Sequence, residues 1–169
     1  APVIVIIDEI EGALGTSTGQ KENDSSGDML APFLTWQAER KGKKIFVVAT
    51  CNRMDNLPPE ATRDGRFDER IFMDVPNRET KDSIWQIYLK KFKLALDSKL
   101  PNDADWTGAE IEACIKKSYM KKITLEQAAK QIVPVSRRMG EQTMKWLREL
   151  AAKSCLDAET GLPVTLAVA

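Results

Sequence analysis

The feature that most constrains this chain is a run of five β-branched apolar residues at positions 3–7, followed at once by Asp8 and Glu9. An unbroken apolar run is typical of a strand buried on both faces in a parallel sheet covered by helices. Such sheets bind ligands at the carboxyl ends of their strands, where Asp8 and Glu9 stand. One carboxylate can hold a hydrated Mg²⁺, and the other can orient or deprotonate a water. The alternative is a core strand that ends in a solvated acidic turn.

Two further apolar runs predict the rest of a parallel sheet. Residues 45–49 predict a second buried strand, and the polar segment after it contains Asn52. Because the carboxyl ends of parallel strands meet at one sheet edge, this segment is expected beside the two carboxylates. A third strand is predicted at residues 70–75.

Helical periodicity and capping residues predict the remaining elements. Asp28 and Asn77 can cap helices with their side chains, and Gly42 can end the first of these helices. The stretch 15–27 is rich in Gly, Ser, Thr and Asp and predicts a mobile loop. The predicted helices cover residues 28 to about 41, a short turn within 57–63, 77 to about 94, 107–120, 124–132 and about 136–154.

A change in composition predicts how the chain is divided. Residues 1–95 alternate strands and helices, which is the pattern of an α/β subdomain. Residues 96–105 turn polar, and every periodic segment beyond them predicts helix, so residues 96–154 are expected to form an all-α subdomain. Residues 155–169 form a tail whose pattern leaves a strand-like and a disordered end both open.

The overall composition excludes several functional classes. The 169 residues include 25 basic and 25 acidic side chains, so no net field favours nucleic acid or an anionic membrane. There is no histidine, which excludes histidine-dependent catalysis and most zinc sites. Cys51, Cys114 and Cys155 are widely spaced, as in a reduced intracellular protein. No apolar run can span a bilayer and no signal peptide is present, so a cytoplasmic or organelle-stromal protein is expected.

Three segments, taken in order, resemble the AAA ATPases: VIVIIDEIE, then FVVATCNRMDNLPPEATRDGRFDERIFMDVPN, then DWTGAEIEACI. The similarity runs from residue 3 to about residue 153. Within the family, the segments FLTWQ, LPPE with GRFDE, and IVPVSRRMGEQ are most similar to poorly characterised AAA proteins of algal chloroplasts and cyanobacteria. The resemblance implies an α/β fold with a P-loop-type parallel sheet, here incomplete with three strands, followed by an all-α lid subdomain.

The resemblance also implies roles for single residues. Asp8 resembles the Walker B residue that supports Mg²⁺, and Glu9 the residue that activates the attacking water. Asn52 resembles the sensor 1 side chain that contacts the γ-phosphate and that water. Arg66, in GRFD, matches the arginine finger that reaches the nucleotide of a neighbouring subunit. A guanidinium there stabilises the charge that phosphoryl transfer spreads onto oxygen atoms.

Further positions follow from the same resemblance. Gly108 and Ala109 resemble the residues whose small size lets the lid approach the adenine of ATP. Many relatives carry a second arginine three residues after the finger, where this chain has Glu69, with Arg70 next. Either Arg70 substitutes for that second arginine or the second contact is absent.

Each assignment has a plainer alternative. Glu9 could cap the next turn, and Asn52 could be an ordinary turn residue after a strand. Arg66 and Arg63 could be surface charges paired with nearby aspartates.

A phosphate-binding motif of the form GxxxxGK[ST] does not occur in the 169 residues. Backbone N–H groups and a lysine of that motif cradle the nucleotide phosphates in P-loop proteins. In the sheet order of the family the strand that precedes this motif lies between the strands at 45–49 and 70–75. We therefore expect a C-terminal fragment of an AAA module, inactive by itself.

The resemblance implies a parent protein that hydrolyses ATP with Mg²⁺ as a homo-oligomeric ring, most simply a hexamer, and remodels a protein substrate that the sequence does not identify. The alternative is a catalytically dead adaptor that uses Arg66 to assemble with an active neighbour. Nucleic-acid handling is disfavoured because the charges are balanced and no basic stripe is present. No membrane partner is expected.

Overall fold

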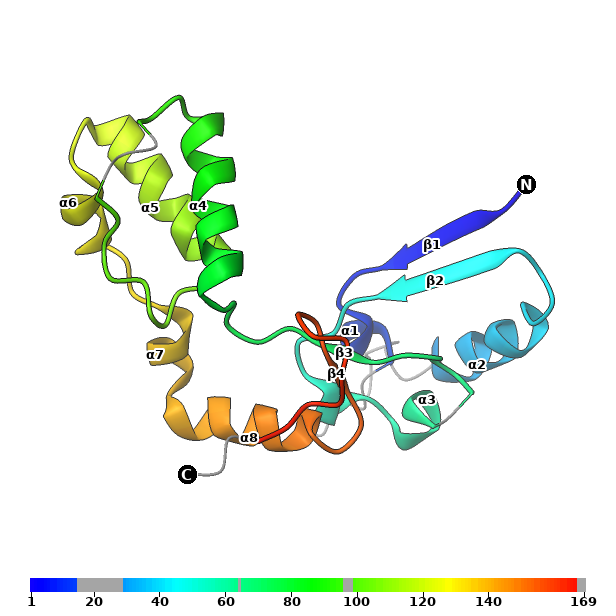
Figure 1. The fold of residues 1–169 in the computed structure, drawn as a ribbon. Helices are drawn as coiled ribbons and strands as arrows, with labels where there is room; N and C mark the ends of the chain where they lie inside the picture. Colours follow the sequence, from blue (N-terminus) through cyan, green and yellow to red (C-terminus); the bar gives the residue numbers. More distant parts are fainter. Residues whose placement is uncertain (15–28, 64, 96–98, 167–169) are drawn as a thin grey trace, which may run out of the picture. The chain divides into compact units, whose positions relative to one another are not determined.

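The computed structural model describes residues 1–14, 29–63, 65–95 and 99–166 of the chain. They form two compact units, Ala1–Asp68 and Glu69–Ala169, and each is described by itself (Figure 1). The predicted mobile loop at 15–27 and the predicted helix cap Asp28 lie outside the described residues. The division predicted between residues 95 and 96 differs from this grouping and stays a prediction.

The first unit is built on the two strands predicted nearest its start. β1 (Val3–Ile7) and β2 (Ile45–Ala49) pair in parallel along their whole length, first residue opposite first and last opposite last. Figure 1 shows them as neighbouring arrows that point the same way. α1 (Ile10–Leu14) and α2 (Leu30–Glu39) lie between them in the chain. Parallel neighbours joined through helices are the α/β arrangement that the sequence predicts.

A small core packs beneath this pair of strands. It centres on Ile10 and Leu14 of α1 and on Ala61, all buried. Ala61 belongs to α3 (Pro59–Thr62), which follows the 3-10 helix η2 (Met54–Asn56). Half-buried apolar side chains surround the three buried ones: Ile7, Leu30, Phe33, Ala49, Leu57 and Phe67.

One face of the two strands does not match the prediction of burial on both sides. Ile4 and Ile6 of β1 are 68% and 73% exposed, and their cross-strand partners Phe46 and Val48 are exposed as well. Successive side chains of a strand point to opposite faces, so these four residues share one face. Within the described residues no element covers that face, and the residues of the opposite face are half-buried except for Val3, which is exposed.

The third predicted strand lies in the second unit and is shorter than expected. The prediction that it belongs to one sheet with the first two strands was wrong, because it forms a separate two-stranded sheet. β3 (Ile71–Phe72) pairs in parallel with β4 (Leu156–Asp157), which lies in the tail that the sequence pattern left open. α4 (Arg78–Lys91) follows, and the Asn77 side chain caps it by accepting the Thr80 N–H at 2.9 Å. The predicted cap at Asn77 is therefore confirmed.

The core of the second unit is helical. α4 packs against α5 (Gly108–Lys121), and α5 packs against α6 (Leu125–Ala129). Both α5 and α6 begin within one residue of their predicted starts. The buried apolar side chains of these helices and of the segment before α5 form one continuous cluster, made of Trp85, Leu89, Trp106, Ile111, Cys114, Ile115, Leu125 and Ala128.

The prediction of one continuous helix at the end of the helical part was wrong. The segment expected at 136–154 is two helices, α7 (Val135–Met139) and α8 (Glu141–Ala151), separated at Gly140. Gly140 has φ +82° and ψ 149°, a backbone conformation that residues with a Cβ atom rarely adopt. Apolar periodicity continues through this point, so the sequence pattern does not reveal the break. Among the helices that the structure describes, none has the length and apolar composition to cross a bilayer.

Candidate functional site

Three of the predicted site residues meet at the carboxyl ends of β1 and β2. Asp8 and Glu9 follow β1, and Asn52 comes three residues after β2. The Asn52 Nδ2 group donates a hydrogen bond to Glu9 Oε1 at 3.2 Å. All three side chains are exposed. The parallel register places these strand ends side by side. The polar groups therefore lie close together at this sheet edge, as the sequence predicts.

Thr50 joins the two strand ends, a residue that the sequence analysis did not single out. Its hydroxyl donates to Asp8 Oδ1 and accepts the backbone N–H of Glu9 at 2.9 Å. Its backbone N–H donates to the Ile7 carbonyl at 2.9 Å, and its carbonyl accepts from Ile10 at 3.0 Å. Thr50 therefore extends the strand pairing past the last residue of each strand and holds both carboxylate-bearing residues.

The backbone of Glu9 adopts the left-handed conformation, with φ +50°. Non-glycine residues take up this conformation rarely, and it ends the extended strand. The next residue, Ile10, then begins α1. Glu9 is thus displayed at the turn between strand and helix, with its N–H fixed by Thr50 and its carboxylate fixed by Asn52.

A second residue missed by the sequence analysis is Glu11, in the first turn of α1. Its Oε1 atom accepts the backbone N–H groups of Asn52 at 2.8 Å and of Arg53 at 3.3 Å. Burial alone would raise the pKa of Glu11, but hydrogen bonds from the Asn52 backbone and other nearby donors lower it below its usual range. The spacing Asp8, Glu9, Glu11 in DEIE was the available signal, because it puts a third carboxylate beside the same sheet edge.

Cys51 lies between these groups in the chain and is not an activated nucleophile. Burial, followed by the Glu11 carboxylate as hydrogen-bond partner and negative charge, raises the pKa of its thiol to about 12. A thiol needs a lowered pKa to react as a thiolate near neutral pH. As a whole residue Cys51 is exposed, whereas Cys114 and Cys155 are buried.

Arg66 belongs to a turn after α3 and contacts α2. One guanidinium nitrogen donates to the Leu34 carbonyl at 3.3 Å, and the Arg66 carbonyl accepts from the Arg40 guanidinium at 3.4 Å. The next residue, Phe67, stacks on Phe33 of the same helix with ring centroids 6.4 Å apart. The Arg66 side chain therefore bonds to α2, and its backbone N–H donates to the Arg63 carbonyl at 3.2 Å. Asp8, Glu9 and Asn52 instead bond to one another's segments.

Gly108 and Ala109 are the first residues of α5 in the second unit. The Glu110 carboxylate accepts from the N–H and the hydroxyl of Thr107, at 2.7 and 3.0 Å, which fixes the start of the helix. A Cβ added to Gly108 would lie 3.5 Å from Ile84 Cδ1, so Ile84 of α4 passes close to this glycine. That distance is an ordinary van der Waals contact, so the packing of α4 on α5 leaves room for a Cβ at this position.

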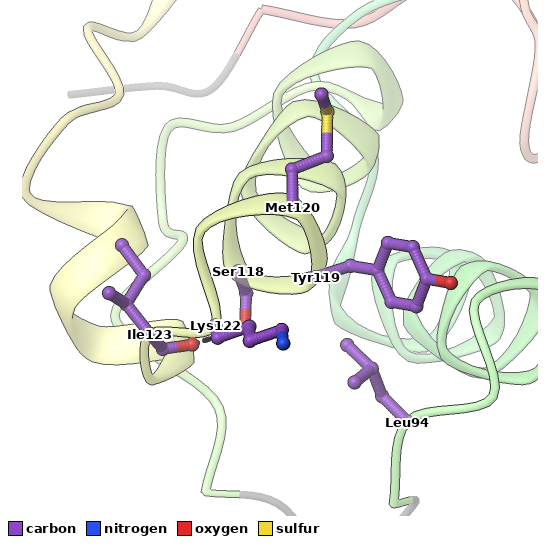
Figure 2. A pocket seen from close by; sticks show the side chains of 6 residues that line it. All are labelled: Leu94, Ser118, Tyr119, Met120, Lys122 and Ile123. Carbon is purple, nitrogen blue, oxygen red and sulfur yellow. Dashed lines mark hydrogen bonds between the residues drawn. The ribbon is translucent and has the colours of Figure 1, made fainter.

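The second unit also has an open pocket of about 530 Å³ at the C-terminal end of α5 (Figure 2). Two of its lining residues are joined, because the Ser118 hydroxyl donates to the Ile123 carbonyl at 2.6 Å. Lys122 is the one charged residue in the lining, and none of the predicted site residues belongs to it. The lining consists of Leu94, Ser118, Tyr119, Met120, Lys122 and Ile123. None of these lining residues carries a carboxylate.

The side chains at the sheet edge fit Mg²⁺ shared with a phosphate ligand. Asp8, Glu9 and Asn52 carry oxygen donors, which hard divalent cations prefer. Within the described residues, no group of three or more His, Cys, Asp or Glu side chains could hold a metal by itself. Magnesium commonly binds through one or two carboxylates together with waters and substrate phosphates. The donor set therefore fits Mg²⁺ delivered with a nucleotide better than a resident protein-bound metal.

Comparison with known proteins gives consistent matches. The model of the ATPase family associated with various cellular activities (AAA) matches residues 1–75. The uncharacterized AAA domain-containing protein ycf46 of Pyropia yezoensis is 36% identical over 159 residues, which is 84% of this chain and 32% of that protein. The proteasome-activating nucleotidase of Saccharolobus islandicus is 30% identical over 167 residues, or 88% of this chain and 42% of that protein.

A solved structure supports the same fold. The AAA domain of FIGL-1, in complex with ADP, matches with a TM-score of 0.66 and 16% identity, covering 90% of this chain and 57% of that one. At this identity the likeness shows the fold alone. The chain spans about a third of the length of the ycf46 protein from Pyropia yezoensis.

Proposed function

Since this chain belongs to the AAA family of ATPases, we propose that Asp8, Glu9 and Asn52 form the hydrolytic side of a Mg·ATP site. The observation that carries the proposal is the 3.2 Å hydrogen bond from Asn52 to Glu9, next to Asp8, at the carboxyl ends of two paired parallel strands. Ligands of open α/β sheets bind at this edge.

The roles follow from the chemistry of each side chain. Asp8 supports the magnesium ion, which neutralises phosphate charge when it is bound. Glu9 accepts the proton of the attacking water, and Asn52 holds the Glu9 carboxylate in place and contributes a donor toward the water. Thr50 keeps Asp8 and the backbone of Glu9 in register with β2.

Arg66 is proposed to act in the site of a neighbouring copy, in a ring that we propose to be a hexamer. Its guanidinium donates to the Leu34 carbonyl in the isolated chain and would exchange that contact for a phosphate oxygen. An arginine supplied from outside in this way typically accelerates phosphoryl transfer by about 10³ to 10⁵. The ring would use hydrolysis to remodel a protein substrate.

Gly108 and Ala109 are proposed to face the adenine from the helical subdomain, taken as residues 96–154. Support comes from their place at a capped helix start, where no long side chain projects. Movement of this subdomain relative to residues 1–95 would open and close the site.

The chain by itself is proposed to turn over no ATP, because its 169 residues contain no GxxxxGK[ST] segment to cradle the phosphates. The test compares ATP turnover by the chain and by a form that also carries such a segment on its N-terminal side, each with a Glu9→Gln variant. We expect turnover only in the extended form and a loss of about 10²-fold or more with Glu9→Gln.

Two results would overturn the proposal. If Glu9→Gln turns over ATP as fast as the unchanged extended form, Glu9 is not the base. If a folded extended form turns over no ATP at all, the chain acts as a non-hydrolysing assembly subunit. Arg66→Ala, mixed with an active partner, would then be the variant to measure.

A further inference from the structure

We propose that Glu11 is a positioning residue of this site, whose carboxylate holds the backbone at Asn52 so that the Asn52 side chain stays on Glu9. The proposal rests on the function proposed above and deepens it. Glu11 does not touch the reacting atoms and acts through Asn52.

The first argument is the pair of anchors on Asn52. Its backbone N–H donates to Glu11 Oε1 at 2.8 Å, and its side-chain amide donates to Glu9 Oε1 at 3.2 Å. One residue is thus held at both ends by carboxylates that are two positions apart in the chain. With the backbone anchored, the short Asn52 side chain has few rotamers left and one of them reaches Glu9.

The second argument is the destination of the Glu11 hydrogen bonds. An acidic residue in the first turn of a helix ordinarily bonds to the free N–H groups of that helix. Glu11 instead accepts from Asn52 and Arg53, which are 41 and 42 positions further along the chain. Its role in the structure is therefore to tie α1 to the segment that follows β2.

The third argument is that Glu11 accepts the backbone N–H groups of two residues that lie outside the regular hydrogen bonding of the strands. Residues 50–53 belong to no helix or strand, and Asn52 and Arg53 are exposed. Hydrogen bonds from backbone N–H groups to an ionised carboxylate are roughly twice as strong as neutral ones.

The first test uses the chain as it is and needs no ATP turnover. Amide hydrogen exchange is measured by NMR for Asn52 and Arg53 in the unchanged chain and in Glu11→Ala, Glu11→Gln and Glu60→Ala. Glu60 is a matched control because it is also an acidic first-turn residue of a short helix in the same unit.

We expect Glu11→Ala to speed exchange at both amides by about 10-fold, the equivalent of one lost hydrogen bond. Glu11→Gln keeps an oxygen acceptor and should restore much of the protection, and Glu60→Ala should change neither amide. Unchanged exchange in a folded Glu11→Ala chain would refute the anchor. Equal acceleration in Glu60→Ala would also refute it, because it would show general loosening of the unit.

The second test asks whether the anchor serves catalysis, in the extended form that carries a GxxxxGK[ST] segment. We expect Glu11→Ala to lower kcat by about 10- to 100-fold with little change in the KM for ATP, because misplacement of a catalytic group affects the chemical step. Glu11→Gln should retain most of kcat. In a Glu11→Ala, Asn52→Ala double variant the two losses should overlap.

The outcomes separate this proposal from the proposed function. If Glu9→Gln abolishes turnover while Glu11→Ala leaves it unchanged or adds its full loss to that of Asn52→Ala, the ATPase proposal holds and the positioning role of Glu11 is wrong. If Glu9→Gln has no effect, the ATPase proposal is wrong. The positioning role, which rests on it, falls with it even where the exchange experiment still shows the anchor on Asn52.

Discussion

The two units of this protein reach order by different means. In the helical unit, eight buried apolar side chains form one closed cluster around Trp85 and Ile115. Among the described residues of the sheet unit three apolar side chains are buried, and one face of the strands, including Ile6, is exposed. The groups proposed for catalysis are held at that sheet edge by hydrogen bonds through Thr50 and Glu11. A packed core thus stabilises one unit, and a network of polar contacts orders the functional edge of the other.

The largest expected effect is in the helical core. Trp85 is 1% exposed and lies near Trp106, with ring centroids 6.3 Å apart. Trp85→Ala should lower the free energy of unfolding by about 3–5 kcal/mol, because it removes a large buried side chain and leaves a cavity. Urea unfolding followed by circular dichroism measures the loss. Trp146→Ala is the control, since Trp146 is 40% exposed in the same unit; equal losses would show that the cluster is not the source of stability.

The next effect concerns a buried polar group within that core. Asp103 is 3% exposed and accepts from Arg78 at 2.7 Å and from Trp85 Nε1 at 2.7 Å. Asp103→Asn keeps the shape but loses the charge that strengthens both bonds, so we expect a loss of about 1.5–3 kcal/mol. Asp82→Asn is the control, because Asp82 also pairs with Arg78 but is exposed. A loss for Asp82→Asn as large as that for Asp103→Asn would contradict the importance of burial.

The same aspartate predicts a dependence on pH. Burial raises the pKa of Asp103, but hydrogen bonds from Arg78 and Trp85 outweigh it and leave the pKa below its usual range. Because the folded pKa lies below the unfolded value of about 3.9, this stabilisation is complete above that value and is lost as the pH falls through the folded pKa. Thermal unfolding measured across this acid range should therefore show a steeper fall for the unchanged chain than for Asp103→Asn. Parallel curves would mean that Asp103 is not the group responsible.

A smaller effect is expected at the break between α7 and α8. Gly140 has φ +82°, and an added Cβ would meet open space, so any cost comes from the backbone. Gly140→Ala should destabilise the unit by roughly 1–2 kcal/mol, or join the two helices. Denaturant unfolding gives the first result and an increase in helical circular dichroism the second. Gly12→Ala, at a glycine inside α1, is the comparison and should be neutral or stabilising.

The smallest effect is expected on the exposed face of the strands. Ile6 is 73% exposed, and Ile6→Thr keeps the branched side chain that strands favour. We expect a change within about 0.5 kcal/mol, against several times that for Ile115→Thr in the helical core. Both are measured by denaturant unfolding. A loss above about 1 kcal/mol for Ile6→Thr would show that this face is covered in solution, which would remove the contrast between the two units.

Local patterns in the sequence determined much of this protein. The apolar runs at 3–7 and 45–49 became β1 and β2, and Asn77 and Thr107 stand at the starts of α4 and α5 as expected. The polar residues after both strands also met where a parallel sheet brings them. These features depend on side-chain periodicity, capping and strand direction, which act over a few residues and can therefore be read from neighbouring positions.

The tertiary structure alone decided the contacts between distant segments. The bonds of Thr50 and Glu11 at the sheet edge join residues about 40 positions apart, and no local pattern states which polar side chain meets which. The pairing of β3 with β4 and the hydrogen bond from Trp85 to Asp103 also join segments that are distant in the sequence. The exposed face of β1 shows an expected contact that is not formed. An apolar run indicates that a strand can be buried, but it does not identify what packs against it. Burial and positioning depend on the chain's full three-dimensional path, and that is what the structure adds.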